Sequence, residues 1–174
     1  MKKKFTLFTV AALSLFALGA CSTTTPTKKE ASQVSSSAAE ANASTDAAKS
    51  TDYKVGDTIV FDGHMEITIT GVEWTEERNQ FADTQPERVL KVTYNIKNLS
   101  DEDYVVGNDM ELYVAGNKME TYPNSSTFET ISKGRNFEGA VQHFGVNGSG
   151  DMELEVEPSF AFDTEPAIIK LDIQ

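Results

Sequence analysis

The sequence contains few of the residues that form disulfides or bind metal ions. It contains one cysteine, Cys21, in 174 residues, so no disulfide can form within one chain and the folded part depends on its hydrophobic core. Its two histidines, His64 and His143, have no second His or Cys at the spacing of a zinc site. Glycine-rich phosphate loops are also absent. We therefore predict no metal, no cofactor and no catalytic residues, and hence no enzyme.

Positive charge is scarce in the second part of the chain. From Tyr53 to Gln174 there are 23 acidic residues against 9 basic ones. Such a surface repels nucleic acid, anionic lipid and anionic wall polymers. We predict no nucleic-acid partner.

Long apolar runs are limited to the start of the chain. Lys2, Lys3 and Lys4 precede the uncharged run FTLFTVAALSLFALGA, which ends directly before Cys21. The run has the length of a secretory h-region and is shorter than the roughly 20 residues of a membrane-spanning helix. This pattern predicts a signal peptide over residues 1–20.

The residues around the cysteine carry a resemblance of their own. Leu18, Gly19, Ala20 and Cys21 resemble the bacterial lipobox, in which the thiol receives diacylglycerol and the chain is cut just before the cysteine. The resemblance implies lipid attachment at Cys21 and a position on the outer face of the cytoplasmic membrane. Two acyl chains would give durable anchoring. An uncleaved anchor or an ordinary secretory signal is the alternative.

Residues 21–52 differ in composition from what precedes and follows them. After Cys21 they are mainly Ser, Thr, Ala, Lys and Glu, and Val34 is the only large aliphatic residue. Such a segment cannot bury enough apolar surface to offset the entropy of ordering. We predict a disordered linker, dispensable for folding, that holds the next domain about 30 Å from the lipid.

Residues 53–174 alternate between apolar and polar side chains. This period of two is typical of strands with one buried and one solvated face. The predicted inward-facing residues are Met65, Ile67, Ile69, Leu90, Val92, Tyr94, Ile96, Met110, Leu112, Val114, Met152, Leu154, Val156, Ile169, Leu171 and Ile173.

Turn signals separate these strands, and no segment has a helical apolar stripe. The pattern predicts an all-β, antiparallel β-sandwich of about seven or eight strands, with EERNQFADTQPER as a long loop after Trp74. Gly71 can mark a β-bulge that turns Val72 and Trp74 inward.

A family resemblance covers nearly all of Tyr53–Gln174. Its motifs are Val55-Gly56-Asp57 before a strand, a strand with Val92, Tyr94, Ile96 and Asn98, and Lys133-Gly134 before a strand with Gly139. The chain resembles the immunoglobulin-like domain of uncharacterised lipoproteins of Gram-positive bacteria. The resemblance implies an immunoglobulin-like sandwich and supplies no catalytic residues. The family usually has an aromatic residue four positions after this glycine. Here His143 occupies that position and the aromatic residue, Phe144, follows it, which indicates a bulge or a shifted register.

Two groups of residues are candidate contact sites. Asp101, Asp103 and Asp109 lie around one loop and could bind calcium, although their spacing fits no EF-hand and a solvated acidic loop is favoured. Trp74 and Phe81 could form an aromatic contact surface, with a core position as the alternative for Trp74.

An acidic row alternates with apolar residues near the end of the chain. It predicts a solvated outer face or charge that protects an exposed strand from pairing, rather than a docking stripe for a basic partner. Its members are Asp151, Glu153, Glu155 and Glu157.

Three classes of function fit these features. The favoured one is a membrane-anchored extracellular lipoprotein that displays a binding domain to an unknown envelope protein or ligand. The alternatives are a passive spacer or adhesin component and an envelope enzyme that uses two convergent carboxylates.

Overall fold

The computed structural model describes residues 23–29 and 53–173, and all regular elements in this part are strands. Seven of them have four or more residues, and the other five have two or three. The strands are β1 (Thr27–Lys28), β2 (Thr58–Phe61), β3 (Met65–Thr75), β4 (Arg88–Asn98), β5 (Tyr104–Val106), β6 (Met110–Val114), β7 (Asn117–Lys118), β8 (Glu120–Thr121), β9 (Glu129–Ile131), β10 (Asn136–Val146), β11 (Met152–Val156) and β12 (Ala167–Leu171).

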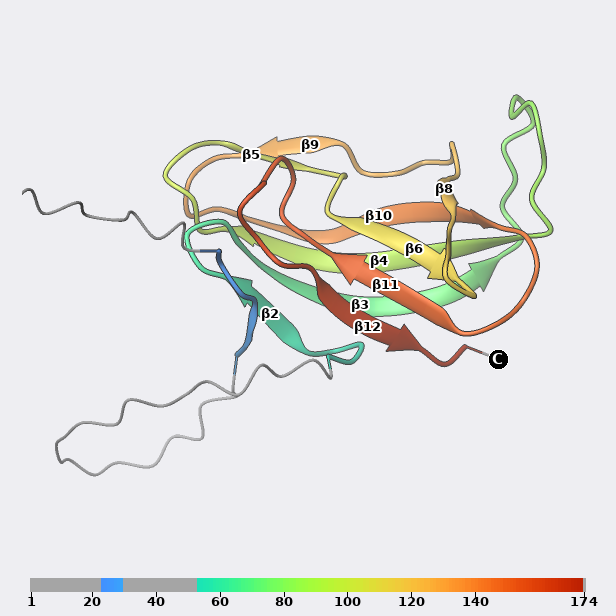
Figure 1. The fold of residues 1–174 in the computed structure, drawn as a ribbon. Coiled ribbons are helices and arrows are strands. Elements are labelled where there is room, and N and C mark those ends of the chain that lie inside the picture. Colours follow the sequence, from blue (N-terminus) through green and yellow to red (C-terminus); the bar gives the residue numbers. More distant parts are fainter. Residues whose placement is uncertain (1–22, 30–52, 174) are drawn as a thin grey trace, which may run out of the picture.

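The strands form the predicted antiparallel β-sandwich. One sheet has the order β1-β2-β3-β4-β10-β8, and the other has the order β12-β11-β6-β7. Figure 1 shows the second sheet lying across the face of the first. The short pair β5-β9 forms a separate two-stranded sheet.

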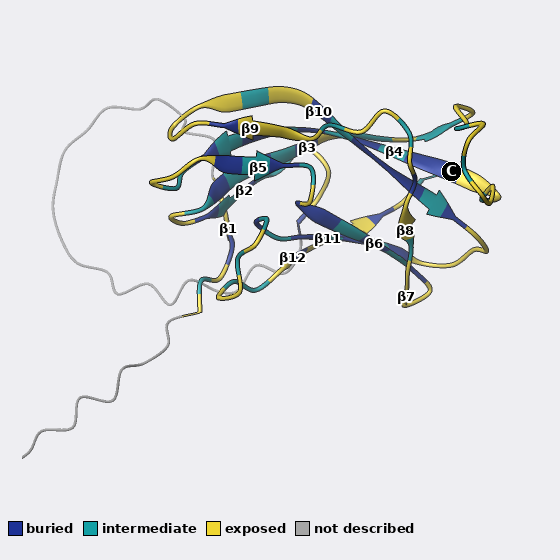
Figure 2. Ribbon diagram, turned by 90° about the horizontal axis from the view of Figure 1, so that it is seen from above, coloured by how far each residue is buried: buried dark blue, intermediate teal, exposed yellow. Residues whose placement is uncertain are grey.

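The core lies between the two sheets, as the alternation predicts. The inward-facing residues of β3, β4, β6 and β11 are buried, and their neighbours along each strand are not, apart from Val89 and Asn98 on β4. Ile169 and Leu171 of β12 are buried as well, and Ile173 packs against the core. Figure 2 shows buried residues along the strands of both layers and exposed residues in the connections.

A β-bulge interrupts β3 at the predicted place. The register between β3 and β4 shifts between Ile69 and Gly71. Before the shift Met65, Ile67 and Ile69 face the core; after it Val72 and Trp74 do. The irregularity predicted near His143 lies earlier in β10, between Phe137 and Ala140.

Residues 23–29 correct the linker prediction. They do not behave as a free tether, because Thr27 and Lys28 pair with Val60 and Ile59 to extend the larger sheet. Lys28 also forms an ion pair with Asp57 at 2.7 Å. The other residues of the predicted linker, 21–22 and 30–52, lie outside the described residues. The prediction failed here because the docking uses backbone pairing, which leaves no apolar pattern in the sequence.

Three further contacts hold this segment. Lys29 Nζ lies 2.8 Å from both carboxylate oxygens of Glu66. The hydroxyl of buried Tyr53 donates to the carbonyl of Pro26 at 2.8 Å. Thr24 forms a parallel bridge with Thr164. The segment is therefore part of the sandwich.

Within residues 23–29 and 53–173, no helix has the length and apolar character needed to cross a bilayer.

Candidate functional site

The two ends of the sandwich carry different structures. We call the end at the β2–β3 turn the near end: there the amide of Leu99 donates to the carbonyl of His64, and Thr24 contacts Asp163. The other, the far end, carries residues 76–87, which join β3 to β4. β4 runs from one to the other over 11 residues, a length of roughly 33 Å.

Within residues 76–87 at the far end, a neutral hydrogen-bond network holds residues 79–85. The hydroxyl of Tyr122 accepts a bond from the amide of Asn79 and donates one to Gln85, both at 2.8 Å. The Gln85 side chain donates to the carbonyl of Asn79, also at 2.8 Å. The network gives this surface loop a defined shape without an apolar core of its own.

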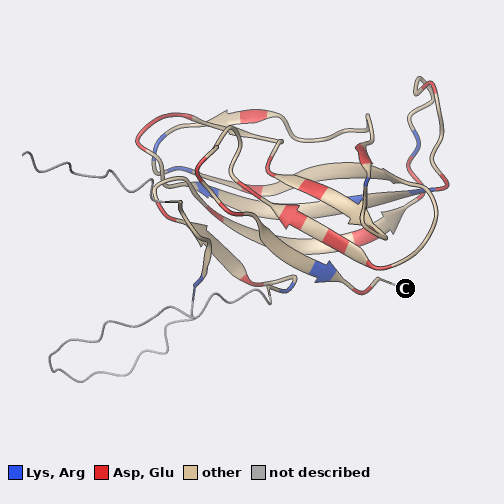
Figure 3. Ribbon diagram, in the orientation of Figure 1, with Lys and Arg blue, Asp and Glu red and all other residues tan. Residues whose placement is uncertain are grey.

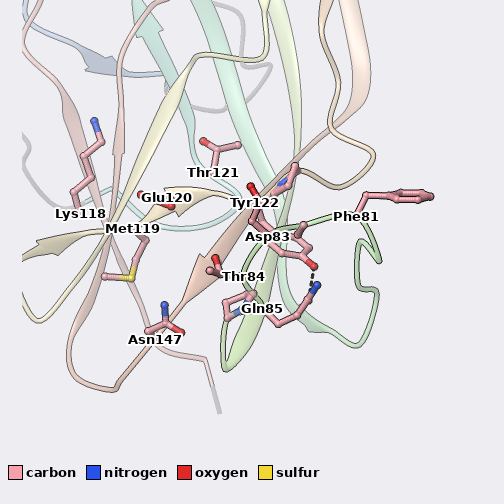
Figure 4. Close-up of a pocket in the computed structure, with 14 residues that line it drawn as sticks. Phe81, Asp83, Thr84, Gln85, Lys118, Met119, Glu120, Thr121, Tyr122 and Asn147 are labelled. Carbon is pink, nitrogen blue, oxygen red and sulfur yellow. Dashed lines mark hydrogen bonds between the residues drawn. The ribbon is translucent and has the colours of Figure 1, made fainter.

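A groove lies between this loop and the chain after β7. It has a volume of about 430 Å³ and is lined by residues 81–86 and 118–123, Gly145 and Asn147. Gly145 permits the close packing of its wall, because a Cβ there would lie 3.2 Å from Pro86. Figure 4 shows the lining residues, with Phe81 pointing away from the others.

A second cavity of about 480 Å³ adjoins the first. Residues 118–121 line both cavities, because here the chain leaves β7 at the edge of one sheet and enters β8 at the edge of the other. Gln142 lines the second cavity and is 3% exposed. Its Oε1 is a buried atom without a hydrogen-bond partner in the described part of the chain. A buried polar atom without a partner is uncommon in folded proteins.

The lining of the groove is mixed in character. Its lining mixes apolar surface from Met119 and Pro86 with polar groups from Thr84, Glu120 and Asn147. Volumes of this order are typical of small-molecule sites, where a few polar groups orient a ligand on an apolar surface.

The predicted aromatic pair is not one surface. Trp74 is partly buried against the core, and the guanidinium of Arg88 lies 4.0 Å from its ring centroid. Phe81 is 84% exposed at the tip of the far-end loop. Trp74 therefore corresponds to the core interpretation, and Phe81 alone stays at the surface.

The predicted calcium residues do not come together. Asp101 is exposed and pairs with Lys133, which lowers the pKa of the Asp101 carboxyl. Asp103 is exposed as well, whereas Asp109 is fully buried. The described ranges contain no group of three or more His, Cys, Asp or Glu residues that could hold a metal ion.

Asp109 instead organises the near end. Its carboxylate accepts hydrogen bonds from the hydroxyls of Tyr104 at 2.6 Å and Tyr94 at 3.1 Å, the amide of Gly107 at 2.8 Å and the hydroxyl of Ser159 at 3.2 Å. Four donors match the lone-pair sites of a carboxylate. Burial raises the pKa of Asp109, against the opposing effect of these donors. Burial and the Asp109 charge also raise the pKa of both tyrosines.

Figure 3 shows acidic residues along β11. Glu153 and Glu155 are partly exposed there, and they alternate with the buried Met152, Leu154 and Val156. β11 is an internal strand between β6 and β12, so the interpretation that its charges protect an exposed edge is wrong. Glu153 faces Lys170 across the strands, whereas Glu155 faces Glu111. Burial, followed by the charges of Glu111, Glu153 and Glu157, raises the pKa of Glu155.

The pair most similar to a nucleophile and base joins an exposed serine to a buried histidine. Ser126 Oγ lies 3.4 Å from Nδ1 of His143, which is 2% exposed on β10. Burial lowers the pKa of His143. Its Nε2 is a buried atom without a partner among the described residues, so no third group orients the ring.

The predicted lipidation residues, Leu18, Gly19, Ala20 and Cys21, lie outside the described residues. The groove itself was not predicted, because the segments that line it are far apart in the sequence and share no motif.

Comparison with known proteins supports the fold. No protein-family model matches the chain, and a search of the curated proteins finds no match. Among solved structures, the "putative lipoprotein (ycdA)" of Bacillus subtilis superposes with a TM-score of 0.54 at 22% identity, over 69% of this chain and 39% of that chain. This chain thus spans about two fifths of the length of ycdA. The yjhA protein of Bacillus subtilis superposes with a TM-score of 0.53 at 16% identity, over 69% of this chain and 99% of that chain.

Proposed function

We propose that the protein is a bacterial envelope lipoprotein, anchored through Cys21, whose sandwich presents the far-end groove to a soluble partner or ligand. The lipobox pattern supports the anchoring, and ycdA carries the name of a lipoprotein. The immunoglobulin-like lipoprotein family of Gram-positive bacteria belongs to the same proposal.

The position of Thr24 carries this proposal. Thr24 docks at the near end, three residues after Cys21, whereas the groove lies at the far end. β4 separates the two by roughly 33 Å. A partner that approaches from outside the cell would therefore meet the groove first.

Anchoring is tested by metabolic labelling with a fatty-acid analogue. The parent should take up label and float with the membrane fraction, and Cys21→Ala should do neither. Label that persists in the Cys21→Ala variant would contradict the proposal.

Groove binding is tested by photo-crosslinking in intact cells. A photoreactive amino acid at Thr84 or Glu120 lies in the groove, whereas one at Lys170 lies on the exposed outer face of β12 and serves as the control. We expect a defined crosslinked product from the two groove positions and none from the control. Equal products from all three positions, or none from any, would favour a passive spacer.

A further inference from the structure

Two phenylalanines are exposed at the near end. Phe160 is 71% exposed and Phe162 is 96% exposed, in the connection from β11 to β12. Large apolar side chains exposed together mark sites of contact with a partner or a membrane.

The connection that carries them is held firmly. The amide of Ser159 donates to the hydroxyl of Tyr104 at 2.8 Å, and its own hydroxyl donates to Asp109. On the other side, Thr164 donates to Glu157 at 2.9 Å. Phe160 also has a φ of 62°, which is rare for a bulky residue and persists only where the surroundings impose it. The rings are therefore presented by a built loop.

This loop lies where the chain arrives from Cys21. The amide of Thr24 donates to the carbonyl of Asp163 at 2.7 Å, and the amide of Glu165 donates to the carbonyl of Thr24 at 3.0 Å. Thr24 is thus hydrogen-bonded to Asp163, the residue that directly follows Phe162. Figure 1 shows the β11–β12 connection and β1 at the same end of the molecule.

Chain length limits how far the anchor can be from this loop. Thr24 is the third residue after Cys21, and an extended chain spans about 3.6 Å per residue, so the two are at most about 11 Å apart. Residues 30–52 follow the docked segment and add nothing to this distance. A lipid on Cys21 would therefore bring the membrane surface to Phe160 and Phe162.

We propose that the two rings insert into the outer leaflet beside the acylated cysteine, so that the domain stands on the membrane with its near end down. The inference rests on the anchoring proposed above. Aromatic side chains are favoured at the boundary between headgroups and acyl chains. Two rings bind weakly by themselves, but the anchor supplies a high local concentration of lipid.

The charges around the loop define the kind of surface that it fits. Glu157, Asp163 and Glu165 are acidic, and the one histidine nearby, His64, has Nε2 3.8 Å from Asp163. Anionic headgroups would be repelled at low ionic strength. We expect insertion to be strongest in phosphatidylcholine vesicles, and to increase with salt in vesicles that also contain phosphatidylglycerol.

The test uses the lipidated protein in vesicles whose acyl chains carry bromine, which quenches nearby tryptophan. Three proteins are compared: the parent with Trp74, the Phe162→Trp variant and the Phe81→Trp variant. Phe81 is the matched control, because it is similarly exposed but lies at the far end. In Phe162→Trp, the emission added by the new tryptophan should shift to shorter wavelength and be quenched. The parent and Phe81→Trp should show no quenching.

Each other result has a distinct meaning. Protein that does not float with the vesicles overturns both the anchoring and the insertion. Protein that floats, with no more quenching in Phe162→Trp than in Phe81→Trp, overturns insertion alone. A blue shift without quenching indicates that a second protein copy covers the rings, and also overturns the proposal. Hydrogen exchange of the parent supplies a readout with native side chains: amides of residues 159–164 should be protected by vesicles, and this protection should be lost in Phe160→Ser with Phe162→Ser.

Discussion

The two ends of the sandwich each hold a surface loop with a buried tyrosine, but the tyrosines have different partners. At the near end the hydroxyl of Tyr104 donates to the carboxylate of Asp109, which is buried and accepts several hydrogen bonds. At the far end the hydroxyl of Tyr122 bonds to the neutral groups of Asn79 and Gln85. A buried charge tolerates no loss of partners, whereas amides can exchange them at lower cost. We therefore expect the near end to be rigid and the far-end loop to be adaptable.

Removing the buried charge tests this contrast most severely. Asp109→Ala should lower the free energy of unfolding by about 3–5 kcal/mol, because it leaves two buried hydroxyls and an amide without an acceptor and creates a cavity. Urea unfolding followed by Trp74 fluorescence measures the change. Asp103→Ala, an exposed acid of the same region, is the control and should change stability by less than about 0.5 kcal/mol. Equal effects would contradict the role assigned to Asp109.

Removing the docked segment tests the near end by a second route. A chain that starts at Tyr53 should melt about 5–10 °C below one that starts at Ser22, because it loses the β1 pairing and the contacts of Lys28, Lys29 and Pro26. Calorimetry provides the comparison. A chain with residues 23–29 replaced by Gly and Ser should melt like the shorter one. Identical melting of all three would restore the interpretation of this segment as a free linker.

The sequence was informative where structure follows from local pattern. Alternation along β3, β4, β6 and β11 identifies the core, and Gly71 identifies the bulge, because each depends on neighbours in the chain. Residues 23–29 could not be predicted, since their contacts with β2 and the β11–β12 connection are distant in sequence and mostly use backbone atoms. Asp109 was misjudged for a related reason: its burial depends on Tyr94, Tyr104 and Ser159, which three separate elements supply.

A pair of matched tyrosine variants sharpens the comparison directly. Tyr104→Phe removes bonds to a charged acceptor and should cost about 1.5–3 kcal/mol, whereas Tyr122→Phe removes bonds to neutral groups and should cost about 1 kcal/mol. Both rings are buried and keep their shape, so the difference reports on the hydrogen bonds. Urea unfolding gives both values. A larger loss in Tyr122→Phe would reverse the assignment of the rigid end.

The Tyr122→Phe substitution should also change amide hydrogen exchange locally. Amide exchange should accelerate in residues 79–85, which the Tyr122 hydroxyl ties down, while β10 stays protected. Uniform acceleration across both would show that the far-end loop and the sheet open together, so that the loop has no separate adaptability.

The outer face of β11 lies between the two ends, and substitutions there should change the free energy of unfolding least. Because the folded state raises the pKa of Glu155, it binds protons more readily than the unfolded chain, and stability from this group falls as pH rises through its folded pKa. At pH 7 Glu155→Gln should therefore stabilise the protein, by about 0.5 kcal/mol in low salt. The gain should shrink in high salt and disappear below the ordinary Glu pKa of about 4.3.

Glu153→Gln is the matched control, because Glu153 faces Lys170 instead of another acid and its neutralisation should bring no gain. Calorimetry at two salt concentrations and two pH values separates these outcomes. A rise in melting temperature of the parent on adding calcium, absent in the double variant of Glu153 and Glu155, would instead show that two strands converge their acids on a cation. The outer face would then be a binding surface in its own right, and the division of roles between the two ends would no longer describe the molecule.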